Sequence, residues 1–483
     1  MYTFKREITK EYKSDIAVVG GGVAGCAAAI AAARLGASTL LIEQSGVLGG
    51  QAGLGLVTPL SSDRSRSGIP FGGLINEISA EVIRLSSEYC IPKYKDTDSD
   101  LAAAGSRISA PHILKYVLMK LCRDSGVRIL FHSSLIGADT GDNRVERLIV
   151  SEKSGLAVVE SRMFIDADGD GELMSFAKDD YMLGSEPEAW ASLAENGLDT
   201  VHFTDKSQSK YTPKNNHAVQ PVSIFFTMGG VDYPRAAAFN NKDLRYADLG
   251  LSFEEFATLP YAGNCGFEQI KEDERLPLPQ GRILVSRGVR NDVAVVNMSR
   301  VIGIDGSDAD SLNRGELLAQ QQVIDLVDFL KRFVPGFEKS YYLESAATLG
   351  VRESRRLAGR YVLTGGDVIN CRRFDDAVAR GSYIIDIHDP NGKSKAIGGE
   401  IHGDFYEIPL RSLESAKYDN LFAAGRCISA DHVAHSSTRI QGTCILTGQA
   451  AGTAAALSLY GSKASPEAVR IQLIASGVWL GDK

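Results

Sequence analysis

One stretch near the start of the chain restricts its fold more than any other. An apolar run over residues 16–19 predicts a buried parallel strand, and Gly20, Gly22 and Gly25 follow it directly in GxGxxG spacing. An Ala-rich helical pattern and then a second apolar strand come next. This order predicts a Rossmann-like βαβ unit that binds a dinucleotide.

Each residue type in this stretch has a physical role. Gly20 lets the strand turn sharply, Gly22 lets the backbone approach a pyrophosphate, and Gly25 lets helix and strand pack closely. The helix N-terminus offers free N–H groups to the phosphates. Glu43 ends the second strand, where a carboxylate accepts hydrogen bonds from ribose hydroxyls. The alternative is a glycine-rich turn in an ordinary α/β protein, and the complete order of features disfavours it.

Composition restricts the class of partner and the cellular setting. The 483 residues carry 52 Lys and Arg against 60 Asp and Glu, a net charge of −8, so neither nucleic acid nor an anionic membrane is expected as a partner. The first residues are too charged for a signal peptide, and no apolar run is long enough to cross a bilayer. Seven scattered cysteines without a CxxC pair argue against a metal or iron–sulfur site and fit a reducing cytoplasm.

A second glycine cluster follows the first unit. Gly49 and Gly50 lie in a run that no strand precedes, so it is not another nucleotide fingerprint. We expect this loop to fold over the bound dinucleotide, the alternative being a mobile surface loop. Beyond it, the sequence predicts helices and then a meander of short strands; their ranges are 71–89 and 111–123 for the helices, and 127–131, 135–138, 145–150 and 157–164 for the strands.

The meander leads to an acidic turn. The run 163–172 is an apolar strand that ends in Asp166, Asp168, Asp170 and a glutamate. The spacing of the three aspartates resembles the first half of a calcium-binding loop. Such a loop needs a glutamate at its twelfth position, and this chain has Ala177 there. We therefore predict a strand end that returns to the nucleotide domain.

The middle of the chain predicts a separate α+β domain. It has a strand over 220–229, paired strands over 282–285 and 293–298, and a long amphipathic helix over 312–333 that Pro335 ends. The last motif, 419–443, precedes an Ala/Gly-rich helix running to about Tyr460. Its small residues predict close packing against the helix after Gly25.

Together these motifs resemble the flavin-dependent oxidoreductases of the fumarate reductase-like superfamily. The chain is most similar to the bacterial FAD-dependent oxidoreductase family that also includes the flavoprotein subunit of heterodisulfide reductases. The similarity runs from about Asp15 to Leu457. The motifs that carry it, beside the opening fingerprint, are the runs 48–52, 165–170, 350–356, 383–388, 408–413 and 420–426.

The resemblance implies FAD as the cofactor. It implies that the first glycines and Glu43 hold the ADP half, that the second loop lines the pyrophosphate and flavin side, and that the late motif contacts ribitol and pyrophosphate through backbone N–H groups. It also implies a helix start aimed at the flavin's pyrimidine edge. The implied residues are Gly20, Gly22, Gly25, Glu43, Gly49, Gly50, Gln51, Ala167, Asp170, Gly425, Arg426, Gly442 and Thr443. The chain departs from the family at Asp168, usually Thr, and at Gln441-Gly442, usually Met-Pro.

Candidate catalytic residues come from the same late motif. His435 and Arg439 are spaced i, i+4, and the resemblance implies that Arg439 anchors a substrate carboxylate. We expect His435 to serve as acid, base or orienting group. Second-rank candidates are His388, His402 and Arg352. The alternatives are structural histidines, and arginines that pair with acids at the domain junction.

We therefore expect an α/β fold with a Rossmann-like FAD-binding domain, a β-meander and an inserted α+β domain. The expected boundaries are 12–172 with 395–465 for the FAD domain, 173–394 for the substrate domain and 466–483 for a tail. The expected function is hydride transfer between a small polar organic substrate and flavin N5, with an unidentified electron donor or acceptor. An electron-transferring flavoprotein subunit is the alternative, and a homo-oligomer is compatible with either. A tRNA-modifying enzyme and a disulfide reductase are disfavoured by the charge and by the absent second fingerprint and CxxC.

Overall fold

The computed structural model describes residues 7–8, 10–89, 106–108, 110–186, 189, 195, 218–232, 235–236, 285–288, 290, 292–390, 397–461 and 463–481. The polar stretch 96–106, which the sequence predicts to be a loop, lies outside them except at its last residue. Most of 232–281, which the sequence predicts to be a mixed insert, also lies outside them.

A seven-stranded sheet, counted over these described residues, organises the fold. Its order is β5-β2-β1-β8-β7-β6, with β19 also paired to β8. The strands are β1 (Lys10–Val19), β2 (Thr39–Ile42), β5 (Arg128–Leu130), β6 (Ser134–Thr140), β7 (Val145–Glu152), β8 (Gly155–Asp166) and β19 (Leu421–Ala423). Both the predicted strand–glycine–strand unit and the predicted meander are therefore confirmed.

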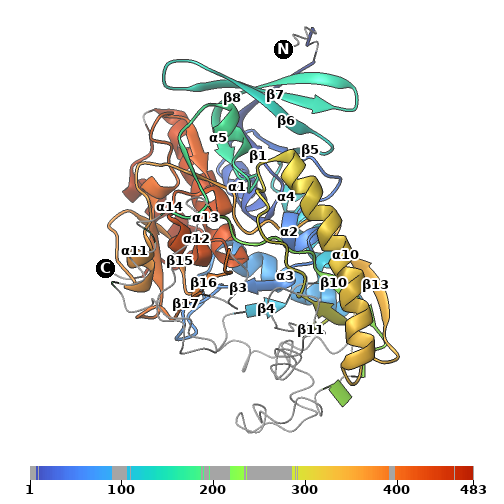
Figure 1. The fold of residues 1–483 in the computed structure, drawn as a ribbon. Helices are drawn as coiled ribbons and strands as arrows, with labels where there is room; N and C mark the ends of the chain where they lie inside the picture. The colour runs from blue at the N-terminus through green and yellow to red at the C-terminus, as the bar shows by residue number, and fades with distance from the viewer. Residues whose placement is uncertain are drawn as a thin grey trace.

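The parallel strands end together, which fixes where a ligand can bind. Val19 is in register with Ile42 and with Asp166, and Asp166 is in register with Ala423. The strands β6, β7 and β8 are antiparallel and extend away from this edge, at the top of Figure 1. In open α/β sheets, ligands bind at the carboxyl ends of the parallel strands.

Two helices from opposite ends of the chain pack tightly on this sheet. Helix α1 (Val23–Arg34) is buried along its first ten residues, and α13 (Gln441–Leu457) lies against it in the centre of Figure 1. A Cβ on Gly448 would overlap the carbonyl oxygen of Ala24, and one on Gly452 would overlap that of Ala28. The predicted packing of the two small-residue helices is confirmed, and it fixes the position of the α1 N-terminus.

A second core lies beside the first. A sheet of order β11-β12-β10-β13 packs against the long helix α10 (Ala309–Phe333), whose N-cap Asp308 accepts the Ser311 N–H. In Figure 1 this helix and β13 form one side of the molecule. The strands are β10 (Phe226–Gly229), β11 (Val285–Arg287), β12 (Ala294–Val296) and β13 (Tyr341–Ser345).

The other elements connect the two cores or cover the first. The helices are α2 (Gly50–Gly53), α3 (Leu74–Tyr89), α4 (Pro111–Asp124), α5 (Glu172–Phe176), α11 (Gly365–Ile369), α12 (His432–Thr438) and α14 (Pro466–Ala475), with the 3-10 turns η5 (Leu410–Ser412), η6 (Gly425–Cys427) and η7 (Ser458–Tyr460). The paired strands are β3 (Pro59–Ser61) with β4 (Ser106–Ile108), β9 (Tyr181–Leu183) with β14 (Arg355–Leu357), β15 (Ala377–Gly381) with β18 (Tyr406–Pro409), and β16 (Ile385–Ile387) with β17 (Ile397–Gly399). The expected domain boundaries stay predictions.

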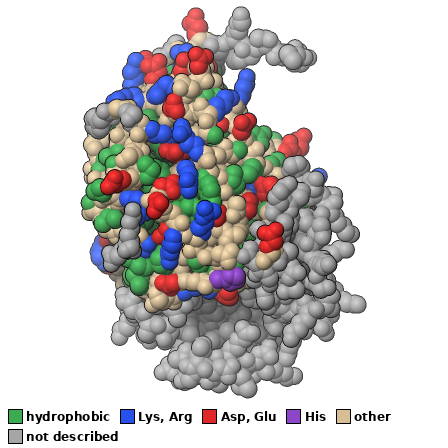
Figure 2. All heavy atoms as spheres, turned by 90° about the vertical axis from the view of Figure 1, so that its left-hand side faces the viewer, with side chains coloured by type: hydrophobic (Ala, Val, Ile, Leu, Met, Phe, Trp, Pro, Cys, Tyr) green, Lys and Arg blue, Asp and Glu red, His purple; other side chains and the backbone are tan. Residues whose placement is uncertain are grey.

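The surface carries charges of both signs. Figure 2 shows acidic and basic side chains interspersed on the face that it draws, rather than gathered by sign. Within the described part of the chain, every helix is too short or too polar to cross a membrane.

Candidate active site

A cavity of about 940 Å³ opens at the carboxyl ends of the parallel strands. Segments from both cores line it, so the dinucleotide turn and the second core share one space. The lining includes residues 19–20, 22–24, 42–45, 49–52, 133–135, 167–170, 348–352 and 439–441, together with Ser223, Phe225, Asn297, Glu316, Tyr383, Asp386, His388, Gly425, Arg426 and Cys444.

Glu43 lies at one end of the cavity and is held by the backbone. Its Oε2 accepts the Gly21 N–H over 2.7 Å, and its Oε1 accepts the Ser45 N–H over 2.7 Å. A carboxylate has about four acceptor sites. Glu43 therefore keeps acceptor capacity toward the cavity, which suits the hydroxyls of a ribose.

The three fingerprint glycines differ in what they do. A Cβ on Gly25 would overlap the Gly20 carbonyl oxygen, so Gly25 permits the close packing and does not line the cavity. Gly20 has φ +95° and packs against the backbone of Asp168. A Cβ on Gly22 would meet no atom within 4 Å, although Gly22 lines the cavity. A side chain at Gly22 would thus project into ligand space alone.

The second glycine loop packs directly on this turn. Gly22 and Gly49 form a parallel bridge, and the Gly49 N–H donates to the Gly21 carbonyl oxygen over 2.8 Å. Gly49 has φ +109° and Gly50 φ +50°, conformations that favour glycine. Both glycines and Gln51 line the cavity.

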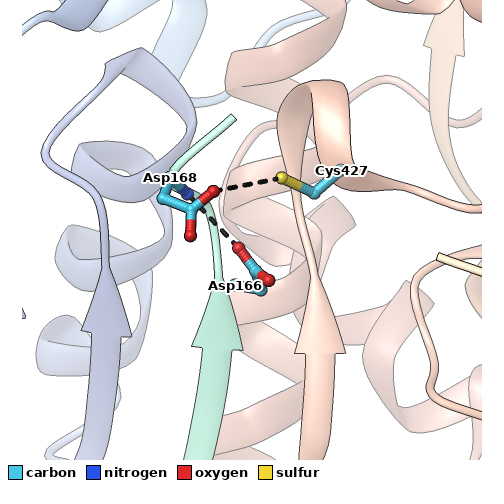
Figure 3. A group of neighbouring side chains, drawn as sticks. All are labelled: Asp166, Asp168 and Cys427. Carbon is cyan, nitrogen blue, oxygen red and sulfur yellow. Dashed lines mark hydrogen bonds between the residues drawn. The ribbon is translucent and has the colours of Figure 1, made fainter. Parts of the chain in front are cut away.

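The acids at the end of β8 hold the turn that follows. Asp168 accepts the N–H groups of Asp170, Gly171 and Glu172 at 2.7–2.9 Å, and Asp166 accepts the Met174 N–H over 2.9 Å. Figure 3 shows the Cys427 sulfur pointing at the Asp168 carboxylate.

This acidic group has the ligand types of a metal site. One ligand atom each from Asp166, Asp168 and Cys427 lies within 4.8 Å of the others. Burial and the neighbouring Asp168 charge raise the pKa of Asp166 well above its ordinary value. The backbone N–H groups that the two carboxylates accept account for their positions without an ion.

Asp170 and Arg426 connect two strand ends across the cavity wall. Arg426 Nη1 lies 3.2 Å from Asp170 Oδ1. The Gly425 N–H donates to Thr447 Oγ1 over 3.1 Å, so it is engaged within the protein rather than facing a ligand. Gly425, Arg426, Ala167 and Asp170 all line the cavity, as the resemblance implies.

The start of α13 presents other residues than those expected. Gly442 packs against the backbone of Ser61 and Ser62, and Thr443 is fully buried with its Oγ1 3.2 Å from Ser62 Oγ. Neither residue lines the cavity, whereas Gln441 and Cys444 do. The helix start is where the sequence predicts it, but the residues that it contributes to the cavity lining are Gln441 and Cys444.

A charged cluster forms another part of the cavity lining. Arg439 Nη2 donates to the Asp386 carbonyl oxygen over 3.1 Å and lies 3.3 Å from Asp386 Oδ2. His388 Nε2 lies 3.5 Å from the same oxygen. Burial opposes ionisation of Asp386, but the hydrogen bond from His388 and the charges of Arg439 and Arg352 outweigh it and hold its pKa well below the ordinary range.

Positive charge exceeds negative charge in this cluster. Arg352 donates to the Pro221 carbonyl oxygen over 2.6 Å, and burial together with the nearby Arg300 and Arg439 lowers its pKa. Because arginine keeps its proton in proteins, this direction reflects the cost of burying a charged guanidinium, to which repulsion from Arg300 and Arg439 adds. Burial, Arg352 and Arg300 lower the pKa of His388 as well, so its imidazole is neutral. The cluster therefore suits an anion.

Two predicted histidines lie elsewhere. His435 is fully buried, and burial lowers its pKa; it does not line the cavity. His402 is exposed, and its Nδ1 lies 3.1 Å from Asn370 Oδ1. The helix of His435 instead joins a buried network in which His432 Nδ1 lies 2.7 Å from Glu353 Oε1, and Arg356 pairs with Glu353 and Glu186. Arg356 thus pairs with acids, as the structural alternative predicts.

Sequence reasoning missed Asp386, although a signal for it exists. Asp386 lies in β16 and His388 follows this strand directly, two residues along the chain, and side chains i and i+2 of a strand lie on one face. Asn297 and Gln441, which also line the cavity, had no recognisable signal.

Unpartnered polar atoms in the lining indicate that the cavity holds a polar ligand. Buried atoms without a hydrogen-bond partner are Gln51 Oε1, Asn297 Oδ1, His388 Nδ1, Arg439 Nε and Gln441 Oε1. Buried polar atoms are almost always satisfied in native proteins. Together with the open space at Gly22, these atoms fit a large polar cofactor and a small polar substrate.

Comparison with known proteins agrees with this geometry. A family model described as "FAD dependent oxidoreductase" matches residues 15–476. Among solved structures, the chain is similar to a geranylgeranyl bacteriochlorophyll reductase-like protein from Thermoplasma acidophilum, at 13% identity and TM-score 0.44, over 96% of this chain and 83% of that one. It is also similar to p-nitrophenol 4-monooxygenase PnpA from Pseudomonas putida DLL-E4, at 10% identity and TM-score 0.44, over 97% and 85% of the two chains. These TM-scores are too low to support a conclusion, so the assignment rests on the family model.

Proposed function

The chain belongs to the FAD-dependent oxidoreductase family, and from that premise we propose that it oxidises or reduces a small organic anion in the cavity. The observation that carries the proposal is the shared space: the dinucleotide turn at Gly22 and the cationic cluster at Arg439 line one cavity. A cofactor at one end and an anion subsite at the other are what a two-substrate redox site needs.

The residues for the cofactor follow from the lining. Glu43, Gly22, Gly49, Gly50 and Arg426 would hold FAD, and when bound FAD supplies hydride transfer to or from its N5 atom. The chain's own part is to position, to neutralise charge and to move a proton.

Arg439 and Arg352 would anchor the anionic group of the substrate. A guanidinium donates two parallel hydrogen bonds to a carboxylate, and Arg439 has a buried Nε without a partner in the protein. Its contact with Asp386 keeps the guanidinium oriented. An anion would also relieve the repulsion among the arginines.

His388 would move the proton, with Asp386 orienting it. The neutral imidazole approaches Asp386 through Nε2, which leaves Nδ1 as an acceptor without a protein partner. A neutral histidine beside a carboxylate is a competent general base. This proposal gives the role expected of His435 to His388, since His435 does not line the cavity.

The experiment is anaerobic mixing of the purified flavoprotein with a panel of small organic acids and their neutral methyl esters. Oxidised flavin is mixed with reduced acids, and reduced flavin with oxidised acids, because either direction is compatible with the site. We expect at least one acid to change the flavin absorbance and its ester to fail. Equal reaction with acid and ester would contradict the anion subsite.

The electron-transferring flavoprotein subunit remains the alternative. Stable copurification with an iron–sulfur protein, together with no response to the panel, would favour it.

The finer placement in the fumarate reductase-like superfamily is also proposed, supported by the late motif and the paired glycine loops. Oligomeric state and cytoplasmic location stay predictions.

A further inference from the structure

Two glutamines in the cavity wall have the same unusual hydrogen bonding. Gln51 Nε2 donates to the Leu349 carbonyl oxygen over 3.0 Å, and Gln441 Nε2 donates to the Val57 carbonyl oxygen over 2.8 Å. A backbone carbonyl can only accept, so each amide orientation is fixed by its partner. The Oε1 atom of each glutamine is therefore the amide atom that these two hydrogen bonds leave unused.

Both Oε1 atoms are buried and have no partner in the protein. A buried acceptor without a donor is costly to stability, and native proteins rarely keep one unless a ligand or water satisfies it. Both side chains line the cavity, and each is an acceptor only at this atom. Two residues of the wall therefore carry fixed acceptors that have no donor within the protein.

A rigid frame holds the two glutamines relative to each other. The Val57 N–H donates to the Gln51 carbonyl oxygen over 3.1 Å, while the Val57 carbonyl oxygen accepts from Gln441. The Gln51 side chain also bonds α2 to the segment at Leu349. Hydrogen bonds therefore connect three parts of the chain: the α2 loop that contains Gln51 and Val57, the segment at Leu349 and the start of α13. The acceptors are preorganised rather than mobile.

We propose that Gln51 and Gln441 are positioning residues that recognise the N–H groups of the FAD isoalloxazine ring. The oxidised ring has one N–H donor, and reduction adds N–H donors, so two acceptors exceed what the oxidised ring offers. One oxygen accepts the N–H that is present in both redox states, and the other gains its donor on reduction. The pair thus stabilises reduced flavin over oxidised flavin. This inference rests on FAD occupying the cavity.

The test uses Gln51→Leu, Gln441→Leu and the double variant, each loaded with FAD. For the double variant we expect at least tenfold weaker binding of oxidised FAD to apoprotein. We also expect a further tenfold loss for reduced FAD, which is a midpoint potential about 30 mV lower for a two-electron couple. Dye equilibration measures the potential without turnover.

Gln449→Leu is the matched control. Gln449 is buried in the same helix, its Oε1 accepts the Leu74 N–H, and it does not line the cavity. We expect this variant to lose thermal stability but keep the wild-type potential. A potential that falls equally in Gln449→Leu would make the effect structural and overturn the proposal.

A second measurement covers variants that fail to fold. Wild-type apoprotein is titrated with FAD and with N3-methyl-FAD, which lacks the ring's permanent N–H. We expect at least tenfold weaker binding of the methylated analogue, and equal binding would overturn the proposal. A folded double variant also overturns the proposal if its affinity for FAD stays within twofold of wild type and its midpoint potential stays within about 10 mV. Failure of wild type to bind FAD at all would instead contradict the cofactor assignment.

Discussion

Arg439 Nη2 lies 3.3 Å from Asp386 Oδ2, and this contact joins the loop before α13 to strand β16. His388 Nε2 lies 3.5 Å from the same carboxylate oxygen. One aspartate thus orients both a cation for substrate and a neutral imidazole for proton transfer. The proposed chemistry depends on this shared carboxylate.

Asp386→Asn should separate proton transfer from anion binding. Removing the charge lowers the pKa of His388 further, because Asp386 is the group that raises it. We expect kcat to fall about 10²-fold or more, with the acid limb of the pH–rate profile moved to lower pH and KM for the anion not increased. Steady-state kinetics over a pH series measure all three. An unchanged kcat would remove Asp386 and His388 from the mechanism.

Gly22→Ala should weaken cofactor binding without unfolding the protein. Gly22 has φ −65° and open space at its Cβ position, so alanine fits the backbone. We expect stability of the apoprotein to change by no more than about 0.5 kcal/mol and FAD affinity to fall at least tenfold.

Gly25→Ala is the informative comparison for that variant. Its Cβ would overlap the Gly20 carbonyl oxygen, so we expect it to lose stability as well as FAD. Chemical denaturation of apoprotein and fluorescence titration with FAD distinguish the two. If Gly22→Ala binds FAD normally, the dinucleotide does not lie over this turn.

Gly448→Val should force α13 away from α1. The new Cβ would overlap the Ala24 carbonyl oxygen at the start of the nucleotide-binding helix. We expect a loss of about 1–3 kcal/mol or more in the free energy of unfolding, together with weaker FAD binding. Thr453→Val places valine in the same helix where a β-branched residue already sits, and should cost less than about 1 kcal/mol. If the two variants lose equal amounts of unfolding free energy, the close approach of α13 to α1 is not the cause of the loss.

Glu353→Gln should change how stability depends on pH. Burial opposes ionisation of Glu353, but His432 and Arg356 outweigh it and lower its pKa from 4.5 to about 2. A lowered carboxyl pKa stabilises the folded protein above the unfolded value, and this contribution is lost as pH falls toward 2.

The shift corresponds to about 3 kcal/mol at neutral pH. We therefore expect the stability difference between wild type and Glu353→Gln to be largest above about pH 5 and to shrink below pH 4. Urea denaturation over this pH range measures it. A difference that does not depend on pH would mean that the Glu353 charge is not the stabilising feature.

The nucleotide half of the site was predictable because it depends on local sequence. The strand, Gly20, Gly22 and α1 are adjacent in the chain, and the packing of α13 on α1 follows from small residues in both helices. The order of these elements in the chain, and the small residues that close packing requires, restrict the possible structures of this half.

The catalytic half was predictable only in part. The i, i+4 spacing of His435 and Arg439 predicts one helix face, but α12 ends before Arg439, which is its C-cap. His435 turns into a buried network while Arg439 reaches Asp386, a residue 53 positions earlier. Such contacts depend on how the last motif packs on β16, and no local pattern encodes that.

The most direct test of the anion subsite is the rate of flavin absorbance change in Arg439→Gln under anaerobic conditions, with the best organic acid of the panel as the reaction partner. Arg84→Gln is the control, since Arg84 pairs with Glu81 and Glu88 on the surface of α3. The account predicts that Arg439→Gln keeps its FAD but needs about 10- to 100-fold more acid to reach half the maximal rate, while Arg84→Gln behaves as wild type. An Arg439→Gln protein that binds FAD and reacts with the acid at wild-type concentrations would contradict it.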